Sequence, residues 1–298
     1  MLIPSNHNES AFIHPLEALN KEIERQGVVV IDDVNYMPSY GEPYISPHLV
    51  IVLCHEGVSR GEQDMRPFVF RRHDFSVVYP NHTIMAKETS DDYRVSLIVI
   101  SNSFFEQIRH RLTYDNSQVF YNQLAIHVAD EHYQCLCDAV RLLKSVGGVD
   151  ISRRTEVIAD ILDLLSLLAD EFRQKSMAQT AFRSSKNAAG SRSYFNSFYE
   201  SLVNHFRESR EVRYYARQLC LSPKYFGTII KQETGVSAGD WIARYVIIRA
   251  KTLLRYRPDL TIQQVYQRLG FSDAASFSRY FKNNTGMTAK EYREQNRR

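Results

Sequence analysis

The spacing of hydrophobic residues divides the chain into a strand-like part and a helical part. An amphipathic helix is expected at 16–26, with Gly27 as its stop. Short runs of β-branched or aromatic residues then follow at 28–31, 49–54, 68–70, 75–79 and 93–100. Turn residues separate them, and short strands at this spacing predict a small sandwich or barrel.

Helical spacing replaces strand spacing after residue 100. The segment 151–174 lacks Gly and Pro, and its apolar residues recur alternately every three and four positions, at Ile158, Ile161, Leu165, Leu168 and Phe172. Such an a/d stripe, here about two heptads long, is shorter than a sustained coiled coil. It can pack on the chain's own barrel or pair with a second subunit, and the pattern leaves both alternatives open.

A stretch without periodicity separates the helical part from the end of the chain. Residues 175–193 are rich in Ser, Ala, Asn and Gly, a composition typical of a flexible linker. We therefore predict a domain at 1–174, a linker at 175–193 and a second domain at 194–298.

The second domain begins with a helix pair joined by a short turn. A helix at 212–219 is followed by Ser222, a capping hydroxyl, and by Pro223 at the first position of the next helix, which reaches residue 232. A helix, a short turn and a capped helix form the geometry that presents the second helix to the major groove of DNA.

The same arrangement returns about fifty residues later. Thr261 and Gln264 form a capping box for a helix at 262–268, and Ser272 or Asp273 caps a helix that runs through residue 283. A long helix at 240–256 joins the two units. One capped pair is weak evidence, because any helical hairpin resembles it, but two copies are much stronger.

Charge separates the two domains as well. The whole chain has a net charge of +3, but residues from 194 onward hold 18 Lys and Arg against 9 Asp and Glu, which leaves the preceding residues net acidic. A basic domain joined to an acidic one is typical of a nucleic-acid-binding module attached to another function.

Several motifs in the second domain match a known family in order and spacing. They are Ala216-x-x-Leu219-x-Leu221-Ser222-Pro223, Gly235-Val236-Ser237, Arg249-Ala250-Lys251-x-Leu253-Leu254, Gly270-Phe271-Ser272-Asp273, Phe277-Ser278-Arg279-Tyr280-Phe281-Lys282 and Gly286-Met287-Thr288. Together they resemble the AraC/XylS family of transcription regulators. The chain departs from that family at Tyr266, where a small alanine is usual, and at Ala289, where proline is usual.

The resemblance implies a fold and a function for the whole chain. The expected fold is α+β, with an N-terminal cupin-like β-barrel with helices, joined by a linker to an all-α domain with two helix-turn-helix units. The expected function is sequence-specific DNA binding in transcription regulation, with activation favoured by the resemblance alone. The first domain would sense a small-molecule effector, pair two subunits into a homodimer, or both.

The outward faces of two helices supply the candidate DNA contacts, in part by their place in the family pattern. The outward residues are Lys224, Gly227, Thr228, Lys231, Ala274, Ala275, Ser276, Arg279 and Lys282. We expect Lys224, Thr228 and Arg279 to contact base edges, although Arg279 could instead bind phosphate or form an intramolecular ion pair. Lys231 and Lys282 are expected to anchor the DNA backbone. The two alanines and Ser276 would meet thymine methyls or leave room for the groove.

The first domain offers no comparable site. Its histidines are scattered, without the His-x-His pair and following Glu of a metal-binding cupin, and Cys135 and Cys137 lie two apart on an expected helix. We therefore expect no metal, no cofactor and no enzyme activity. A pocket inside the barrel, lined by residues of 49–53 and 95–99, is compatible with the pattern. The rival hypothesis is a metal-dependent cupin enzyme or a thiol sensor that uses DNA binding as an address.

Double-stranded DNA and RNA polymerase are the macromolecular partners that this hypothesis requires. Apolar runs fall short of the roughly 18 residues of a membrane helix, and the N-terminus does not resemble a signal peptide. Four cysteines without a regular framework suit a reducing cytoplasm. The sequence does not specify the effector or the operator.

Overall fold

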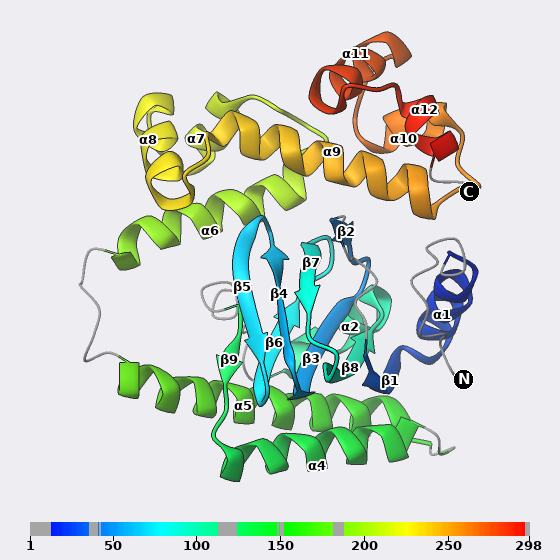
Figure 1. The fold of residues 1–298 in the computed structure, drawn as a ribbon, viewed down its shortest axis with the longest axis vertical. Helices are drawn as coiled ribbons and strands as arrows, with labels where there is room; N and C mark the ends of the chain where they lie inside the picture. The colour runs from blue at the N-terminus through cyan, green and yellow to red at the C-terminus, as the bar shows by residue number, and fades with distance from the viewer. Residues whose placement is uncertain are drawn as a thin grey trace. The chain divides into compact units, whose positions relative to one another are not determined.

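The computed structural model describes residues 13–35, 41, 43–112, 124–147, 149, 152–180 and 188–295. The chain divides into two compact units, Met1–Ser184 and Ser185–Arg298, and each is described here by itself (Figure 1). Among the described helices, none is long and apolar enough to cross a membrane.

Two antiparallel sheets form the body of the N-terminal unit. In spatial order the first sheet contains β1 (Val28–Val34), β8 (Arg94–Ile100), β3 (Leu49–Glu56), β6 (Asp74–Val78) and β9 (Ile126–His127). The second contains β2 (Tyr44–Ile45), β7 (Thr83–Thr89), β4 (Val58–Gln63) and β5 (Arg66–Arg71). A small core with side chains from both sheets, among them Val52, Phe70 and Val95, joins them. The predicted strand-rich N-terminal domain with helices is confirmed, with its strands arranged as two antiparallel sheets.

Strand alternation gives the first sheet two apolar faces. Along β3, Val52 and Cys54 belong to the core between the sheets, whereas Leu49, Ile51 and Leu53 belong to a larger core shared with helices. That larger core includes side chains of α2 (Asn102–Ile108), α4 (Asp130–Gly147) and α5 (Arg154–Thr180). The short 3₁₀ helix η2 (Arg109–Arg111) follows α2, and α1 (Ile13–Gln26) precedes β1. Figure 1 shows α4 and α5 lying against each other along the sheet.

The apolar stripe of α5 packs into this larger core. Ile158, Ile161, Leu165 and Phe172 are buried there, and Leu168 packs against it half-buried. The stripe therefore belongs to the unit's own interior. The exposed leucines of the helix, Leu164 and Leu167, lie outside the stripe.

Helix covers part of the span that we expected to be a linker. The α5 helix continues to Thr180 and α6 (Ala188–His205) begins at Ala188, so only residues 181–187 of the predicted linker lie outside the described part. The extension has a physical reason: Met177, Ala178 and Gln179 are good helix formers, and the span contains no proline.

Seven described helices form the C-terminal unit around an aromatic core. After α6 they are α7 (Val212–Gln218), α8 (Pro223–Thr234), α9 (Ala238–Tyr256), α10 (Ile262–Arg268), α11 (Ala274–Thr285) and α12 (Ala289–Gln295). Trp241 of α9 lies at the centre of the core, with ring centroids 5.0 Å from Phe195 and 5.9 Å from Tyr199. The α9 helix contacts α7 and α8 as well as α10, α11 and α12, so it joins the two helix pairs. The predicted all-α domain is confirmed.

Candidate nucleic-acid interface

The turn of the first helix pair depends on an unusual residue. Between α7 and α8, Cys220 adopts a φ of +56°, in the left-handed region that favours glycine. The amide of the next residue, Leu221, donates to the Ala216 carbonyl at 2.9 Å and closes the turn. Ser222 then caps α8 by accepting from the Tyr225 amide at 3.3 Å, with Pro223 at the first helical position. These caps confirm the start predicted for this helix.

The α8 helix has one buried face and one exposed face. Phe226, Ile229 and Ile230 are buried. The predicted contact residues Lys224, Thr228 and Lys231 are exposed, and Gly227 is half-exposed. The Thr228 hydroxyl donates to the Lys224 carbonyl at 3.0 Å, which leaves the hydroxyl oxygen to accept from another donor.

Our sequence reasoning missed one residue of this face. Tyr225 is 55% exposed on α8, next to Lys224, and it is among the most exposed large hydrophobic side chains of the described chain. An aromatic phenol in that position offers an apolar surface and a hydrogen-bonding tip. The helical periodicity that selected Lys224 and Thr228 could also have selected Tyr225.

The second helix pair uses the same turn with a glycine. Gly270 has a φ of +75°, and the amide of Phe271 donates to the Tyr266 carbonyl at 3.0 Å. The capping box predicted for Thr261 and Gln264 is present at the start of α10. The bulky Tyr266 is half-buried, and its ring centroid lies 6.3 Å from that of Phe277.

Asp273 caps α11 and gives Ser276 a structural role. The Asp273 carboxylate accepts from the Ser276 amide and from its hydroxyl, each at 2.8 Å. These hydrogen bonds, the backbone one first, hold the pKa of Asp273 below its usual range, so the cap stays charged. Because its hydroxyl is engaged in the cap, Ser276 is a weaker candidate for base contact than Arg279.

The exposed face of α11 combines small residues with two cations. Ala274, Ala275, Arg279 and Lys282 are all exposed. In the described part of the chain, Arg279 forms no ion pair, as is also true of Lys224 on α8. The described residues therefore give no support to the alternative that Arg279 forms an intramolecular ion pair. Lys224 lies in the first turn of α8 and Arg279 about one turn into α11, and the exposed amide ends of both helices favour anions.

The two helices also end alike. Gly235 after α8 and Gly286 after α11 have φ values of +73° and +80°, and each donates its amide to a lysine carbonyl four residues earlier at 2.8 Å. The preceding threonines make the same hydrogen bonds. The Thr234 hydroxyl donates to the Val236 carbonyl and accepts from the Val236 amide, and the Thr285 hydroxyl does the same with Met287. The repeat therefore extends through the helix ends.

The loop between α6 and α7 links the first pair to the second. The Arg210 guanidinium lies 3.7 Å from the centroid of the Phe271 ring and donates to the Leu269 carbonyl in the second turn. Burial lowers the pKa of this guanidinium. A β-carbon on Gly270 would lie 2.3 Å from the Arg207 carbonyl oxygen. The loop thus fixes the second turn, a role that local patterns did not predict.

Comparison with known proteins agrees with this geometry. A sequence profile described as a helix-turn-helix domain matches residues 215–295, which span both helix pairs. The arabinose operon regulatory protein of Salmonella typhimurium is 33% identical over 93 residues, covering 31% of this chain and 33% of that protein. The C-terminal unit is therefore similar to AraC-type regulators, in agreement with the predicted resemblance.

Two further comparisons cover more of the chain. The Msm operon regulatory protein of Streptococcus mutans is 25% identical over 139 residues, or 47% of each chain, so this chain spans about half of that relative. A solved structure of ToxT from Vibrio cholerae aligns with 90% of this chain and 97% of its own, at 13% identity and a TM-score of 0.42.

Four histidines and one cysteine of the N-terminal unit are held by hydrogen bonds or burial. Each of four histidines has a hydrogen-bonding partner: His48 with Asn20 at 3.2 Å, His55 with Ser96 at 2.7 Å, His73 with Asp130 at 2.7 Å and His82 with Asp64 at 2.8 Å. Burial raises the pKa of the Cys54 thiol to about 12, which suppresses its thiolate. Among the described residues, no three metal-binding side chains come together in one place.

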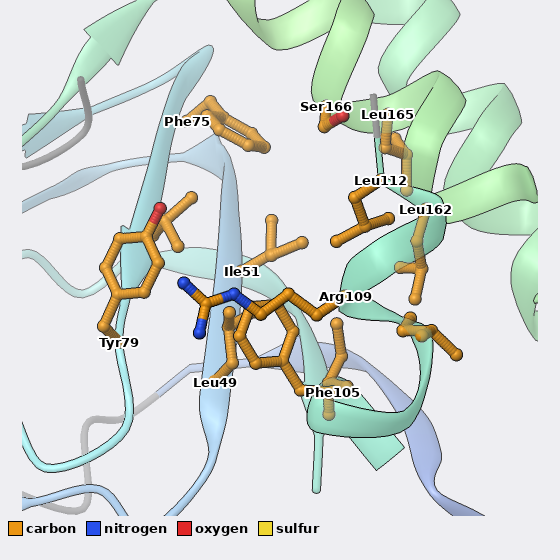
Figure 2. Close-up of a pocket in the computed structure, with 13 residues that line it drawn as sticks. Leu49, Ile51, Phe75, Tyr79, Phe105, Arg109, Leu112, Leu162, Leu165 and Ser166 are labelled. Atoms are coloured by element: carbon orange, nitrogen blue, oxygen red, sulfur yellow. The ribbon is translucent and has the colours of Figure 1, made fainter. Parts of the chain in front are cut away.

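A pocket lies in the N-terminal unit and is lined in part by the segment 49–53, one of the two that the sequence suggested for a pocket. The pocket lies against the helix-covered face of the first sheet, with Leu49 and Ile51 of β3 on one wall and Leu162 and Leu165 of α5 on the other (Figure 2). Alternation along β3 gave which residues share a face, and only the structure shows which face is covered by helices.

Proposed function

We propose that this chain is a sequence-specific DNA-binding transcription regulator and not an enzyme. The observation that carries the proposal is the pair of capped helices, α8 and α11, held in one unit, each with an exposed cation free of described ion pairs. The similarity of the C-terminal unit to AraC-type regulators supports the same function.

Both helices would enter the major groove. The α9 helix that joins them has 19 residues. At 1.5 Å per residue it is about 28 Å long, comparable to the separation of roughly 34 Å between successive major-groove segments on one side of a duplex. Two contact helices on such a spacer suit two adjacent groove segments.

The exposed residues would contact different parts of the DNA according to their chemistry. Lys224, Thr228 and Arg279 are proposed to read base edges, with Arg279 suited to bidentate contact with guanine. Lys231 and Lys282, near the helix ends, would bind phosphates. Gly227, Ala274, Ala275 and Ser276 would let the helices approach closely, and Tyr225 adds an aromatic contact in the first unit.

The N-terminal unit would control DNA binding in one of two ways. A small-molecule effector or a second copy of the chain could favour one state of the regulator over another, and so change how often it occupies DNA. Contact with RNA polymerase and activation of transcription, in the cytoplasm, complete the proposal. The rival metal enzyme would carry stoichiometric iron, zinc or manganese, which elemental analysis of the purified protein measures directly.

Selection from a random DNA duplex library tests the DNA-binding proposal. We expect the full-length protein to enrich one motif with two parts about one helical turn apart. Arg279→Ala should relax one part and Lys224→Ala the other. Lys290→Ala is the matched control, because Lys290 is an exposed lysine of α12, outside both contact helices. Salt-sensitive binding without any enriched motif would refute sequence-specific binding and favour an architectural DNA-binding protein.

A further inference from the structure

The pocket of the N-terminal unit is built into its main core. Its accessible volume is about 80 Å³, which is well above the space that a single water molecule needs. Protein interiors otherwise hold few voids larger than a water molecule. A space of this size between sheet and helices loses packing contacts, so an occupant would recover them.

Apolar side chains form most of the lining. On the sheet side it is bounded by Ile51, Phe75 and Val77, and on the helix side by Phe105, Ile108 and Leu162. Ile51, Phe75, Val77, Ile108 and Leu162 are buried members of the larger core. Such walls favour a hydrocarbon or aromatic body and disfavour a sugar or another polar molecule.

One cation is set among these apolar walls. Among the described residues that line the pocket, Arg109 alone carries a charge. It begins η2, directly after α2. Figure 2 shows its side chain extending from the helical wall toward Tyr79 on the sheet side. A guanidinium at the edge of an apolar pocket is suited to bind a carboxylate or a similar anion.

We propose that this pocket binds a small amphipathic monoanion, with its apolar body between the sheet and α5 and its anionic group at Arg109. The inference deepens the proposed function, on which its regulatory meaning rests, by giving the effector a site and a chemical class. The far wall includes Ser166 of α5, and α5 leads directly into the segment before the C-terminal unit. A ligand wedged against α5 therefore acts on the helix that connects covalently to the DNA-binding unit.

Calorimetric titration of the full-length protein with octanoate tests the site, with octan-1-ol as the neutral counterpart. We expect one octanoate per chain and at least fivefold weaker binding of octan-1-ol, because the alcohol lacks the charge that Arg109 would bind. Arg109→Gln should weaken octanoate about fivefold to tenfold and leave octan-1-ol unchanged. Arg111→Gln removes the same charge two residues away, outside the lining, and should change neither affinity.

A second pair of variants tests the apolar body. Ser166→Phe should fill the pocket and abolish binding of both ligands, whereas Leu167→Phe, at an exposed neighbouring position outside the lining, should not. If Ser166→Phe does not fold, Arg109→Gln at the exposed end of the site still tests the proposal. Failure of octanoate to bind, equal binding of octan-1-ol, or unchanged binding in Arg109→Gln would overturn the proposal.

The same preparations separate this inference from the proposed function. DNA selection that succeeds while octanoate fails to bind removes the ligand site and leaves the DNA-binding regulator. Octanoate binding with a flat DNA selection leaves the ligand site and removes the sequence-specific regulator.

Discussion

The two helix pairs of the C-terminal unit share a framework but differ in their turns and exposed faces. Both turns need a residue with positive φ, which is Cys220 in the first pair and Gly270 in the second. Gly270 has no room for a side chain beside Arg207, whereas Cys220 is exposed. The backbone bend is therefore common to both turns, and only the second also needs the close packing that glycine permits.

The exposed faces differ in the size and charge of their side chains. Aligned from their ends, α8 presents Lys224, Tyr225 and Thr228 where α11 presents Ala275, Ser276 and Arg279. The first face is bulky near its start, and the second is small there with its cation one turn later. If both read DNA, they read different sequences, so the two parts of the operator should not be repeats of each other.

The largest expected effect concerns the second turn. Gly270→Ala places a β-carbon 2.3 Å from the Arg207 carbonyl oxygen at a φ of +75°. The conformational cost and the clash together should destabilise the C-terminal unit by about 3 kcal/mol. Denaturant unfolding followed by the fluorescence of Trp241, the sole tryptophan of the chain, measures this. Gly286→Ala, at a φ of +80° but in open space, is the control and should cost only about 1 kcal/mol. Equal losses would mean that the Arg207 contact is unimportant.

The second-largest effect is expected when a base-contacting residue is removed from either exposed face. Arg279→Ala and Lys224→Ala should each weaken binding to the selected operator by about 1–3 kcal/mol and relax only one part of the motif. Fluorescence anisotropy on operators altered in one part at a time measures which part of the motif each residue reads. A uniform loss on every operator would assign the residue to phosphate binding instead.

Replacing the glycine in the middle of α8 should have opposite effects on helix stability and on DNA binding. A β-carbon on Gly227 would meet nothing within 4 Å. Gly227→Ala should thus stabilise α8 by up to about 1 kcal/mol, because alanine is the better helix former. If α8 approaches DNA closely there, the same variant should bind DNA more weakly. Ser278→Gly makes the reverse change, from a side chain to glycine, at the corresponding position of α11. Tighter DNA binding by Gly227→Ala would show that the glycine is not needed for approach.

The smallest effect is expected at the first turn. Cys220→Gly relieves a left-handed conformation that costs a non-glycine residue about 1–2 kcal/mol, but glycine also gains freedom in the unfolded chain. A net stabilisation on the order of 0.5 kcal/mol should remain. The midpoint of the Trp241 unfolding transition should rise slightly, and a fall would indicate that the Cys220 side chain has a packing role.

Much of the C-terminal unit could be predicted because its signals are local. Ser222 with Pro223 and Thr261 with Gln264 lie within a few residues of the helix starts that they fix. Contact between Arg210 and the second turn could not be predicted in this way. The two lie about sixty residues apart, and nothing in their immediate surroundings specifies the pairing.

The N-terminal unit was harder to predict because strands give faces but not their partners. The a/d stripe of α5 was evident in the sequence, yet its periodicity suits a subunit interface as well as a core. Only the structure shows that Leu165 faces the unit's own sheet. The same ambiguity along β3 left open which of its faces lines a pocket, and the structure shows that Leu49 and Ile51 do so on the face covered by helices.

The pairing of β1 with β8 has a consequence for how the chain becomes native. Val28 lies opposite Ile100, so the strands can align only after a loop of about 70 residues has closed, which is entropically costly and slow. The C-terminal helices form through contacts between near neighbours, which is a faster process. In a refolding chain the unit that binds DNA would therefore mature before the unit that is proposed to control it. A mutation that slows β1 pairing would create a transient population of regulators that occupy DNA without responding to any signal.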